Sequence, residues 1–192
     1  EIAQCLVGSE MCIRDRDNMV LQQNTQVNVW GKAAPGEKVT VKASWLDKAV
    51  TAKAAANGKW TVKLKTPKAT TNQSVTVSGE NEITINNVLI GEVWLCTGQS
   101  NMEFPVSRHP DVKWNTGMLN EAEELKDADY PEIRLFHVKH QLAHEGELDD
   151  CEGEWLVCNP KNLYDFSAVG FVFGRKLYKE LKLSLIHISE PT

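Results

Sequence analysis

No stretch of the 192-residue chain holds the ~18–20 consecutive apolar residues that a membrane-spanning helix needs. The sequence also lacks a basic block: 21 Lys and Arg stand against 26 Asp and Glu, for a net charge of −5. This balance argues against nucleic acid or an anionic membrane surface as a partner. Five cysteines are too few for a fold built on disulfides. What remains is an ordinary globular protein of one or two domains.

The two ends of the chain differ in character from its middle. Residues 5–16 read CLVGSEMCIRDR, and residues 183–192 read LSLIHISEPT. One oligonucleotide encodes the first segment on one strand and the second, from CTG TCT CTT ATA CAC ATC onward, on the other. We therefore expect residues 1–16 and 183–192 to be translated sequencing adapter that makes few contacts with residues 17–182. A short natural tail at each end is the alternative.

The first part of the middle, residues 17–86, has the pattern of an antiparallel β-sandwich. Apolar and polar residues alternate over 27–30, 39–43, 60–64 and 75–77, which indicates strands with one buried face. Pro35-Gly36 and Asn57-Gly58 mark turns between them. Several such strands with turn signals favour a sandwich, and nothing catalytic stands out in it.

Residues 87–182 change to an α/β pattern. The nearly continuous apolar run over 88–96 predicts a strand covered on both faces, as in a parallel sheet. Helical spacing over 119–128, a strand at 133–138 and a helix over 168–181 capped by Ser167 follow. Strand, helix, strand, helix begins an α/β domain. Because two strands leave the sheet's edges uncovered, we expect only the first part of that domain.

A polar turn at the carboxyl end of the first predicted strand draws attention to Ser100. Open α/β sheets place ligands at this position, and a serine there can present its hydroxyl and its backbone N–H to a reacting carbonyl. Most serines after strands only form turns or cap helices, so position alone leaves both readings open. The turn is not a G-x-S-x-G nucleophile elbow, since Met102 stands two residues after Ser100.

Residues 91–103, which read GEVWLCTGQSNME, resemble the nucleophile block of the sialate O-acetylesterase family, a group of SGNH-type hydrolases. The similarity extends to residues 19–23, 29–39, 133–136 and 166–175. It implies a β-sandwich followed by the first part of an SGNH-type, flavodoxin-like three-layer α/β domain. It also implies a serine esterase that needs no cofactor and no metal.

The resemblance assigns roles to individual residues. It implies that Ser100 attacks the carbonyl of an O-acetyl ester on a sugar, and that the Ser100 N–H helps to hold the oxyanion. Gly170 resembles a second oxyanion-hole glycine, although a small residue that lets helix and sheet pack closely is the alternative. Gly98 and Gln99 lie near the site. Asn101 fixes the turn by side-chain hydrogen bonds or touches the substrate.

The base histidine and the orienting aspartate of the family lie beyond Lys182, so we expect the chain itself to be nearly inactive. The local histidines are expected at the surface or at strand edges: His109, His137, His140 and His144. We expect the acidic run over residues 145–154 to be a solvated loop rather than a metal site. Zinc is not expected either, because Cys151 and Cys158 have no second pair of ligands.

The cysteines and tryptophans lead to structural expectations. Cys151 and Cys158 are candidates for a disulfide if the protein is exported, and Cys96 is expected to be buried beneath the turn. Trp94, Trp114 and Trp155 are expected in the core, with the floor of a sugar site as the alternative.

Taken together, the sequence predicts a fragment of a carbohydrate O-acetylesterase whose partner is an O-acetylated sugar, either sialic acid or a polysaccharide side chain. Two alternatives stay open: an acetyl-xylan or other polysaccharide deacetylase, and a non-catalytic carbohydrate-binding protein on the same scaffold. A periplasmic or secreted location is expected, because acetylated glycans are mostly extracellular.

Overall fold

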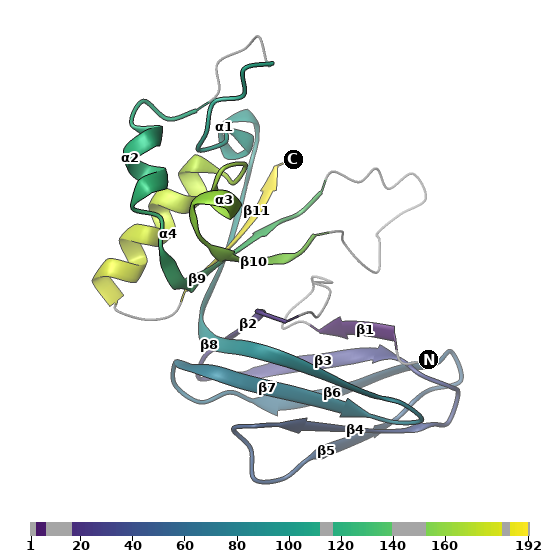
Figure 1. The fold of residues 1–192 in the computed structure, drawn as a ribbon. Coiled ribbons are helices and arrows are strands. Elements are labelled where there is room, and N and C mark those ends of the chain that lie inside the picture. Colours follow the sequence, from purple (N-terminus) through teal and green to yellow (C-terminus); the bar gives the residue numbers. More distant parts are fainter. Residues whose placement is uncertain (1–2, 7–16, 112–116, 140–152, 182–184, 192) are drawn as a thin grey trace. The chain divides into compact units, whose positions relative to one another are not determined.

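The computed structural model describes residues 3–6, 17–111, 117–139, 153–181 and 185–191, and for 3–6 and 185–191 it describes the backbone alone. The chain divides into two compact units between Gly91 and Glu92 (Figure 1). Unit 1 holds the described residues up to Gly91, and unit 2 holds those from Glu92 onward. None of the described helices is long and apolar enough to cross a membrane.

Most of unit 1 consists of strands. In chain order they are β1 (Ala3–Leu6), β2 (Val20–Gln22), β3 (Gln26–Lys32), β4 (Lys38–Ala43), β5 (Val50–Lys53), β6 (Lys59–Lys65), β7 (Thr70–Ser78) and the first half of β8 (Glu82–Gly98). Antiparallel pairing gives the order β1-β3-β6 in one sheet and β8-β7-β4-β5 in the other, and β2 runs parallel to β8. The strands predicted from alternation are confirmed in β3, β4, β6 and β7.

The alternation of unit 1 sorts its side chains into a buried and an exposed set. In β6, Trp60, Val62 and Leu64 are buried, and the residues between them are exposed. In β4, Val39 and Val41 are buried in the same manner. Each ladder therefore has one apolar face, which is the physical reason for the period of two in the sequence.

The turn at Asn57-Gly58 depends on glycine. Gly58 has a φ of +78°, and a Cβ atom there would lie 2.8 Å from the carbonyl oxygen of Ala33. The Gly58 carbonyl accepts a hydrogen bond from the Ala33 N–H (2.9 Å), and the Asn57 side chain accepts one from the Lys59 N–H (3.0 Å). The turn predicted from Asn-Gly is confirmed, and it packs tightly against the segment before β4.

The described residues of unit 2 form the second half of β8, three more strands and four helices. They are α1 (Ser100–Glu103), α2 (Glu121–Lys126), β9 (Tyr130–His137), β10 (Trp155–Cys158), α3 (Pro160–Leu163), α4 (Ala168–Leu181) and β11 (Leu185–Pro191). The strand order is β10-β9-β11-β8; β11 runs parallel to β8 and β9, whereas β10 is antiparallel to β9. The predicted helix 168–181 and strand 133–138 are confirmed, and the helix expected over 119–128 is shorter.

Two expectations about β8 are wrong. β8 pairs with β7 over residues 82–90 and with β11 over residues 92–98. One strand therefore joins the strands of residues 17–86 to the strands of the α/β pattern, although the two groups of strands were expected in separate sheets. Gly91 is tolerated within a strand, and no proline interrupts the run. The expected cover on both faces is also missing, because Trp94 is 40% exposed and Leu95 is 45% exposed. The domain boundary at residues 86–87 stays a prediction.

The expectation that both end segments make few contacts is wrong as well. Leu185–Pro191 forms the central strand β11, and Ala3–Leu6 pairs with β3. Residues 185–188 are apolar or β-branched for the most part and follow a helix, which suits a parallel strand reached by a helical crossover. The adapter origin of the two segments stays a prediction.

A core of buried residues holds unit 2 together. Its members come from the segment after α1, from β9, β10 and α3, and from α4: Val106, Ala128, Ile133, Leu135, Cys158, Leu163, Phe166, Ala168 and Phe171. On the rim of this core Arg175 of α4 binds the buried carboxylate of Glu124 with two guanidinium nitrogens, one of them at 3.0 Å. This bidentate pair joins α2 to α4, which lie side by side in Figure 1.

We predict that Gly58→Ala lowers the free energy of unfolding by more than about 1 kcal/mol, since alanine disfavours positive φ and its Cβ would press on a backbone carbonyl. Gly36→Ala is the matched control: its φ is +81°, but its Cβ would meet only the end of the Lys53 side chain at 3.6 Å. Urea denaturation of both variants measures the difference. Equal losses would contradict the close contact with Ala33.

We also predict that Cys158 makes stability depend on alkaline pH. Burial, with a smaller contribution from Asp129, raises the pKa of this thiol from 9.0 to about 12. The unfolded chain therefore loses this proton first, so the contribution is complete below about pH 9 and is lost as the pH rises toward 12. Unfolding of the parent and of Cys158→Ala across that range should show a steeper alkaline decline in the parent; parallel curves would refute it.

Candidate functional site

The predicted nucleophile stands at the first residue of α1, directly after the end of β8. The carbonyl of Gln99 accepts hydrogen bonds from the N–H groups of Met102 (2.8 Å) and Glu103 (3.3 Å), and this turns the chain at the strand end. At Gly98 a Cβ atom would lie 3.3 Å from the Cβ of Met102, so the turn leaves little room for a side chain there. Ser100 is exposed on the surface of unit 2.

Three backbone hydrogen bonds fasten the segment after α1 to the start of α4. The N–H of Ala168 donates to the Phe104 carbonyl (2.8 Å), and that of Val106 donates to the Phe166 carbonyl (3.0 Å). The third runs from Ser107 to Tyr164 (3.1 Å). We call residues 104–107 and 164–168 the clamp. Because α1 has only four residues, the clamp rather than the helix itself determines where Ser100 lies.

Ser167 connects the clamp to both helices. Its hydroxyl accepts a hydrogen bond from the Gly170 N–H (3.2 Å) and donates to the Met102 sulfur (3.3 Å), and its side chain is buried. Gly170 is the third residue of α4, so the first bond is an N-cap and confirms the predicted capping role. The second bond ties the start of α4 to the helix that carries the nucleophile.

This arrangement gives the Gly170 N–H a partner other than the expected oxyanion, whose binding at Gly170 stays a prediction. The Gly170 N–H is buried and is occupied by the Ser167 hydroxyl. A Cβ atom at Gly170 would lie 3.4 Å from Phe166 and 3.4 Å from Ser167. The geometry favours the other reading of this residue, a small side chain that allows close packing at the start of α4.

Of the remaining residues of the polar turn, Gln99 and Asn101 are exposed. Gln99 contributes its carbonyl to the turn, and Gly98 is half-buried. The expectation that Asn101 fixes the turn by side-chain hydrogen bonds is not met, because within the described residues its exposed amide has no such partner. The backbone carbonyl of Gln99 performs that function instead.

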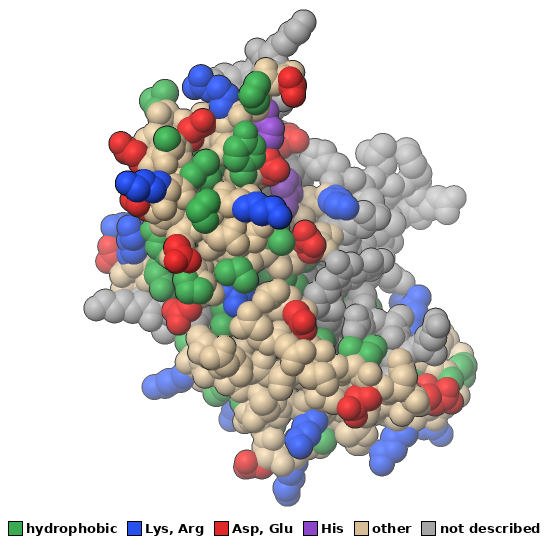
Figure 2. All heavy atoms as spheres, viewed as in Figure 1, with side chains coloured by type: hydrophobic (Ala, Val, Ile, Leu, Met, Phe, Trp, Pro, Cys, Tyr) green, Lys and Arg blue, Asp and Glu red, His purple; other side chains and the backbone are tan. Residues whose placement is uncertain are grey.

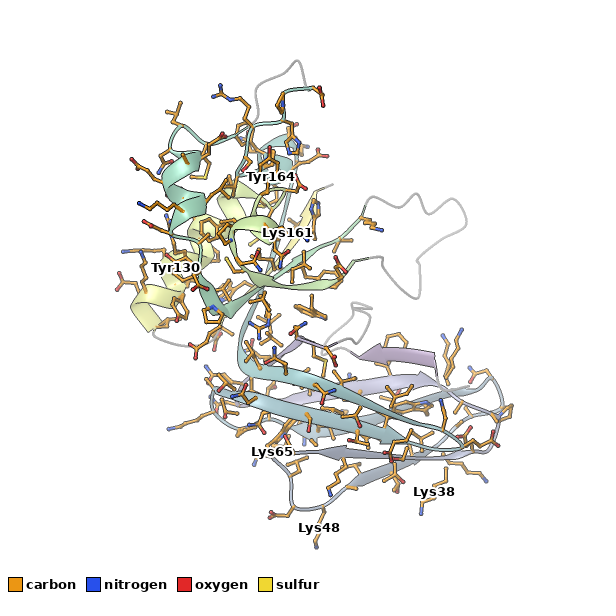
Figure 3. All side chains as sticks on the ribbon, viewed as in Figure 1. Lys38, Lys48, Lys65, Tyr130, Lys161 and Tyr164 are labelled. Atoms are coloured by element: carbon orange, nitrogen blue, oxygen red, sulfur yellow. The ribbon has the colours of Figure 1, made fainter. Side chains whose placement is uncertain are left out.

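Among the described residues, no base is bonded to the proposed nucleophile. Within the part of the chain that the structure describes, the Ser100 hydroxyl has no hydrogen-bonded partner. His109 pairs instead with Asp165, at 3.0 Å between Nε2 and Oδ1, and its ring meets Tyr164 edge-on at 5.4 Å. Tyr164, labelled in Figure 3, donates its hydroxyl to the Arg108 carbonyl at 2.9 Å. Sequence reasoning missed this pair, since its members are far apart in the chain.

The second described histidine, His137, ends strand β9. Its ring meets the Phe166 ring edge-on at a centroid distance of 6.4 Å, so it borders the clamp. Its position at a strand end agrees with the expectation of a strand-edge histidine. His140 and His144 lie outside the described residues, as do Trp114, Cys151 and residues 145–152 of the acidic run.

The described tryptophans and cysteines divide between core and surface. Trp155 is buried against Phe136 at 4.8 Å, which confirms core packing, whereas Trp94 is partly exposed and meets Phe173 edge-on at 5.5 Å. Cys96 is half-buried rather than fully buried, and burial raises the pKa of its thiol. Among the described residues no group of three or more His, Cys, Asp or Glu forms a candidate metal site.

Comparison with known proteins places this geometry in a family context. The chain is 32% identical to the sialate O-acetylesterase of Mus musculus over 183 residues, which is 85% of this chain and 32% of the mouse protein. It is 31% identical to the human sialate O-acetylesterase over 195 residues, which is 92% of this chain and 35% of that protein. The chain is a relative of the sialate O-acetylesterases.

A solved structure agrees with this relation. The crystal structure of a carbohydrate acetylesterase from Xanthomonas citri matches 90% of this chain and 38% of its own length, with a TM-score of 0.79 and 29% sequence identity. No family model matches the chain. The chain spans about a third of the length of the curated relatives it matches.

We predict that Ser167→Ala lowers the free energy of unfolding by about 1 kcal/mol, because α4 loses its cap and the Gly170 N–H loses a buried partner. Ser167→Thr, which keeps the hydroxyl, should lose less. Amide hydrogen exchange should show faster exchange at Gly170 in Ser167→Ala than in the parent. Unchanged exchange at Gly170 would contradict the cap.

Proposed function

We propose that the chain carries the nucleophile of a serine-dependent carbohydrate O-acetylesterase. The observation that carries this proposal is the placement of Ser100: exposed, at the first residue of α1, directly beyond the carboxyl end of β8, in a relative of the sialate O-acetylesterases. Open α/β sheets bind ligands at this position. The resemblance of residues 91–103 to a nucleophile block supports the same serine.

The chemistry of the proposed site follows from the turn. The Ser100 Oγ attacks the acetyl carbonyl while a base takes its proton, and the Ser100 N–H at the start of α1 donates to the developing oxyanion. The acyl C–O bond to the sugar then breaks, and the sugar leaves as an alcohol with that proton. Water hydrolyses the acyl-enzyme, which releases acetate and restores the Ser100 hydroxyl. Gly170 is not part of this proposal, because its N–H caps α4. A second oxyanion donor and the base must therefore come from other residues of the whole protein.

The carbohydrate acetylesterase structure shows a similar fold, and we propose the type of each unit in more detail. We infer that unit 1 is a β-sandwich, since each of its ladders has one buried apolar face. We infer that unit 2 is the first part of an SGNH-type α/β domain, since strands β8 and β9, which run in the same direction, combine with helix α4. We also propose that residues 1–16 and 183–192 derive from sequencing adapter, which the DNA of the gene tests.

The proposed substrate is an O-acetyl group on a sugar, either sialic acid or a polysaccharide side chain. The names of the mouse and human relatives favour sialic acid, and that of the Xanthomonas citri protein favours carbohydrate esters in general. A periplasmic or secreted location would bring the enzyme to such glycans. No cofactor or metal is part of the proposed mechanism, which a serine nucleophile and a base complete.

The test is acetate release by the 192-residue chain, by the full-length gene product and by its Ser100→Ala variant. O-acetylated sialic acid, acetyl-xylan and an aryl acetate serve as substrates. We predict turnover by the full-length protein and loss of at least about a thousandfold in Ser100→Ala, because the acyl-enzyme no longer forms. The 192-residue chain should be nearly inactive, since no base is bonded to Ser100 among its described residues.

Ser78→Ala provides the matched control, because Ser78 is a serine of β7 in unit 1 that bonds Glu82. It should leave turnover unchanged. Normal activity of Ser100→Ala would overturn the nucleophile assignment. Full activity of the 192-residue chain would make a local histidine the base. A full-length protein that binds these sugars without hydrolysing them would favour the non-catalytic alternative.

A further inference from the structure

Unit 1 is basic although the chain as a whole is acidic. Over residues 17–91 there are nine lysines and no arginine against five carboxylates. The lysines are Lys32, Lys38, Lys42, Lys48, Lys53, Lys59, Lys63, Lys65 and Lys68, and the acids are Asp17, Glu37, Asp47, Glu80 and Glu82. Lysine side chains, in blue in Figure 2, project from this unit, and Lys38 and Lys48 extend away from it in Figure 3. The charge of −5 therefore conceals a local excess of positive charge.

One face of unit 1 carries lysine without any acid. β3 and β6 pair in register, and their buried residues point to the core. The β3–β6 outer face consists of the residues between them: Gln26, Asn28, Trp30, Lys32, Lys59, Thr61, Lys63 and Lys65. Four of these eight side chains are lysines, and none is a carboxylate. A face of this composition attracts anions.

Trp30 gives the β3–β6 outer face an aromatic surface. Trp30 is half-buried and lies on the side of β3 that faces away from the core. It stands opposite Thr61 and diagonal to Lys63 on β6. The core of unit 1 does not require it there, because Val27 and Val29 point inward from the same strand. A tryptophan whose apolar body lies at a polar surface is typical of recognition sites, and its flat ring suits the apolar face of a sugar ring.

The polar neighbours of Trp30 suit a sugar that carries a carboxylate. Asn28 stands opposite Lys63, and Gln26 stands opposite Lys65, so two amides alternate with two ammonium groups on adjacent strands. Lys32 also stands opposite Lys59. Like charges at directly opposite positions destabilise a sheet, and a bound anion between them relieves the repulsion.

We propose that the β3–β6 outer face binds an anionic polysaccharide, with Trp30 stacking on a sugar ring and Lys63 and Lys65 contacting its carboxylates. Complementary charge selects this occupant over a neutral glycan, and the aromatic surface selects it over a polyanion without exposed sugar rings. The face would hold a carboxylated glycan chain independently of Ser100. The esterase assignment can therefore stand or fall separately, because binding is measured without turnover.

The experiment is affinity electrophoresis of the 192-residue chain in gels that contain polysialic acid, dextran of matched size, or double-stranded DNA. Retardation by polysialic acid alone is the expected result, and it should weaken as salt screens the lysines. The double variant Lys63→Glu, Lys65→Glu should bind at least about fivefold more weakly, and Trp30→Ala should also bind more weakly.

The matched control reverses two charges on another ladder, Lys38→Glu with Lys42→Glu on β4. It changes the net charge by the same amount and should change the affinity less than about twofold. Circular dichroism verifies the fold of every variant. If Trp30→Ala fails to fold, the Lys63→Glu, Lys65→Glu variant alone tests the proposal. Its fold should persist, because both lysine side chains are exposed.

Four results would overturn the proposal. They are no retardation by polysialic acid, equal retardation by dextran, equal or tighter binding of DNA, and equal loss in the β4 control. The last two would show attraction by net charge rather than a site on the β3–β6 outer face. Acetate release by the full-length protein is recorded separately, and its presence or absence changes none of these readings.

Discussion

The hydrogen bonds of the clamp are the constraint on which the candidate site depends. α1 has four residues, and a helix of this length has little stability of its own. Three backbone bonds from residues 104–107 to residues 164–168 hold its far end, and Ser167 adds a contact to Met102. Ser100 is therefore positioned by a segment more than sixty residues away, which in turn is fixed by the buried residues around Phe166 and Phe171.

Local patterns predicted local structure well. The alternation of β3, β4, β6 and β7, the Asn57-Gly58 turn and the helix over 168–181 depend on neighbours in sequence, and each was found. Partner choice was not predictable in this way. The apolar run over 88–96 shows that a strand can be buried, but it does not show which elements cover it; Trp94 and Leu95 are exposed because their cover is incomplete.

In the candidate site, too, local features were predictable from sequence, whereas contacts between distant residues were not. Ser100 followed from its place after a strand together with the resemblance, and its exposure agrees with both. The resemblance suggested an oxyanion role for Gly170, whereas the structure shows its N–H capped by the serine three residues earlier, a capping position that the sequence also predicted. The pair of His109 and Asp165 could not be predicted, because only the folded clamp brings two loop residues so distant in sequence together.

The net charge of the chain does not describe the charge of its individual surfaces. The overall charge of −5 and the absence of a basic block argued against nucleic acid or an anionic membrane surface as a partner. A bound ligand, however, interacts mainly with charges within roughly 10 Å rather than with the sum over the chain. On a strand, lysines that share a face are separated by buried residues, so Lys59, Lys63 and Lys65 never form a run. A search for consecutive charges detects tails and helices, whereas a basic sheet face becomes visible only when every second residue is counted.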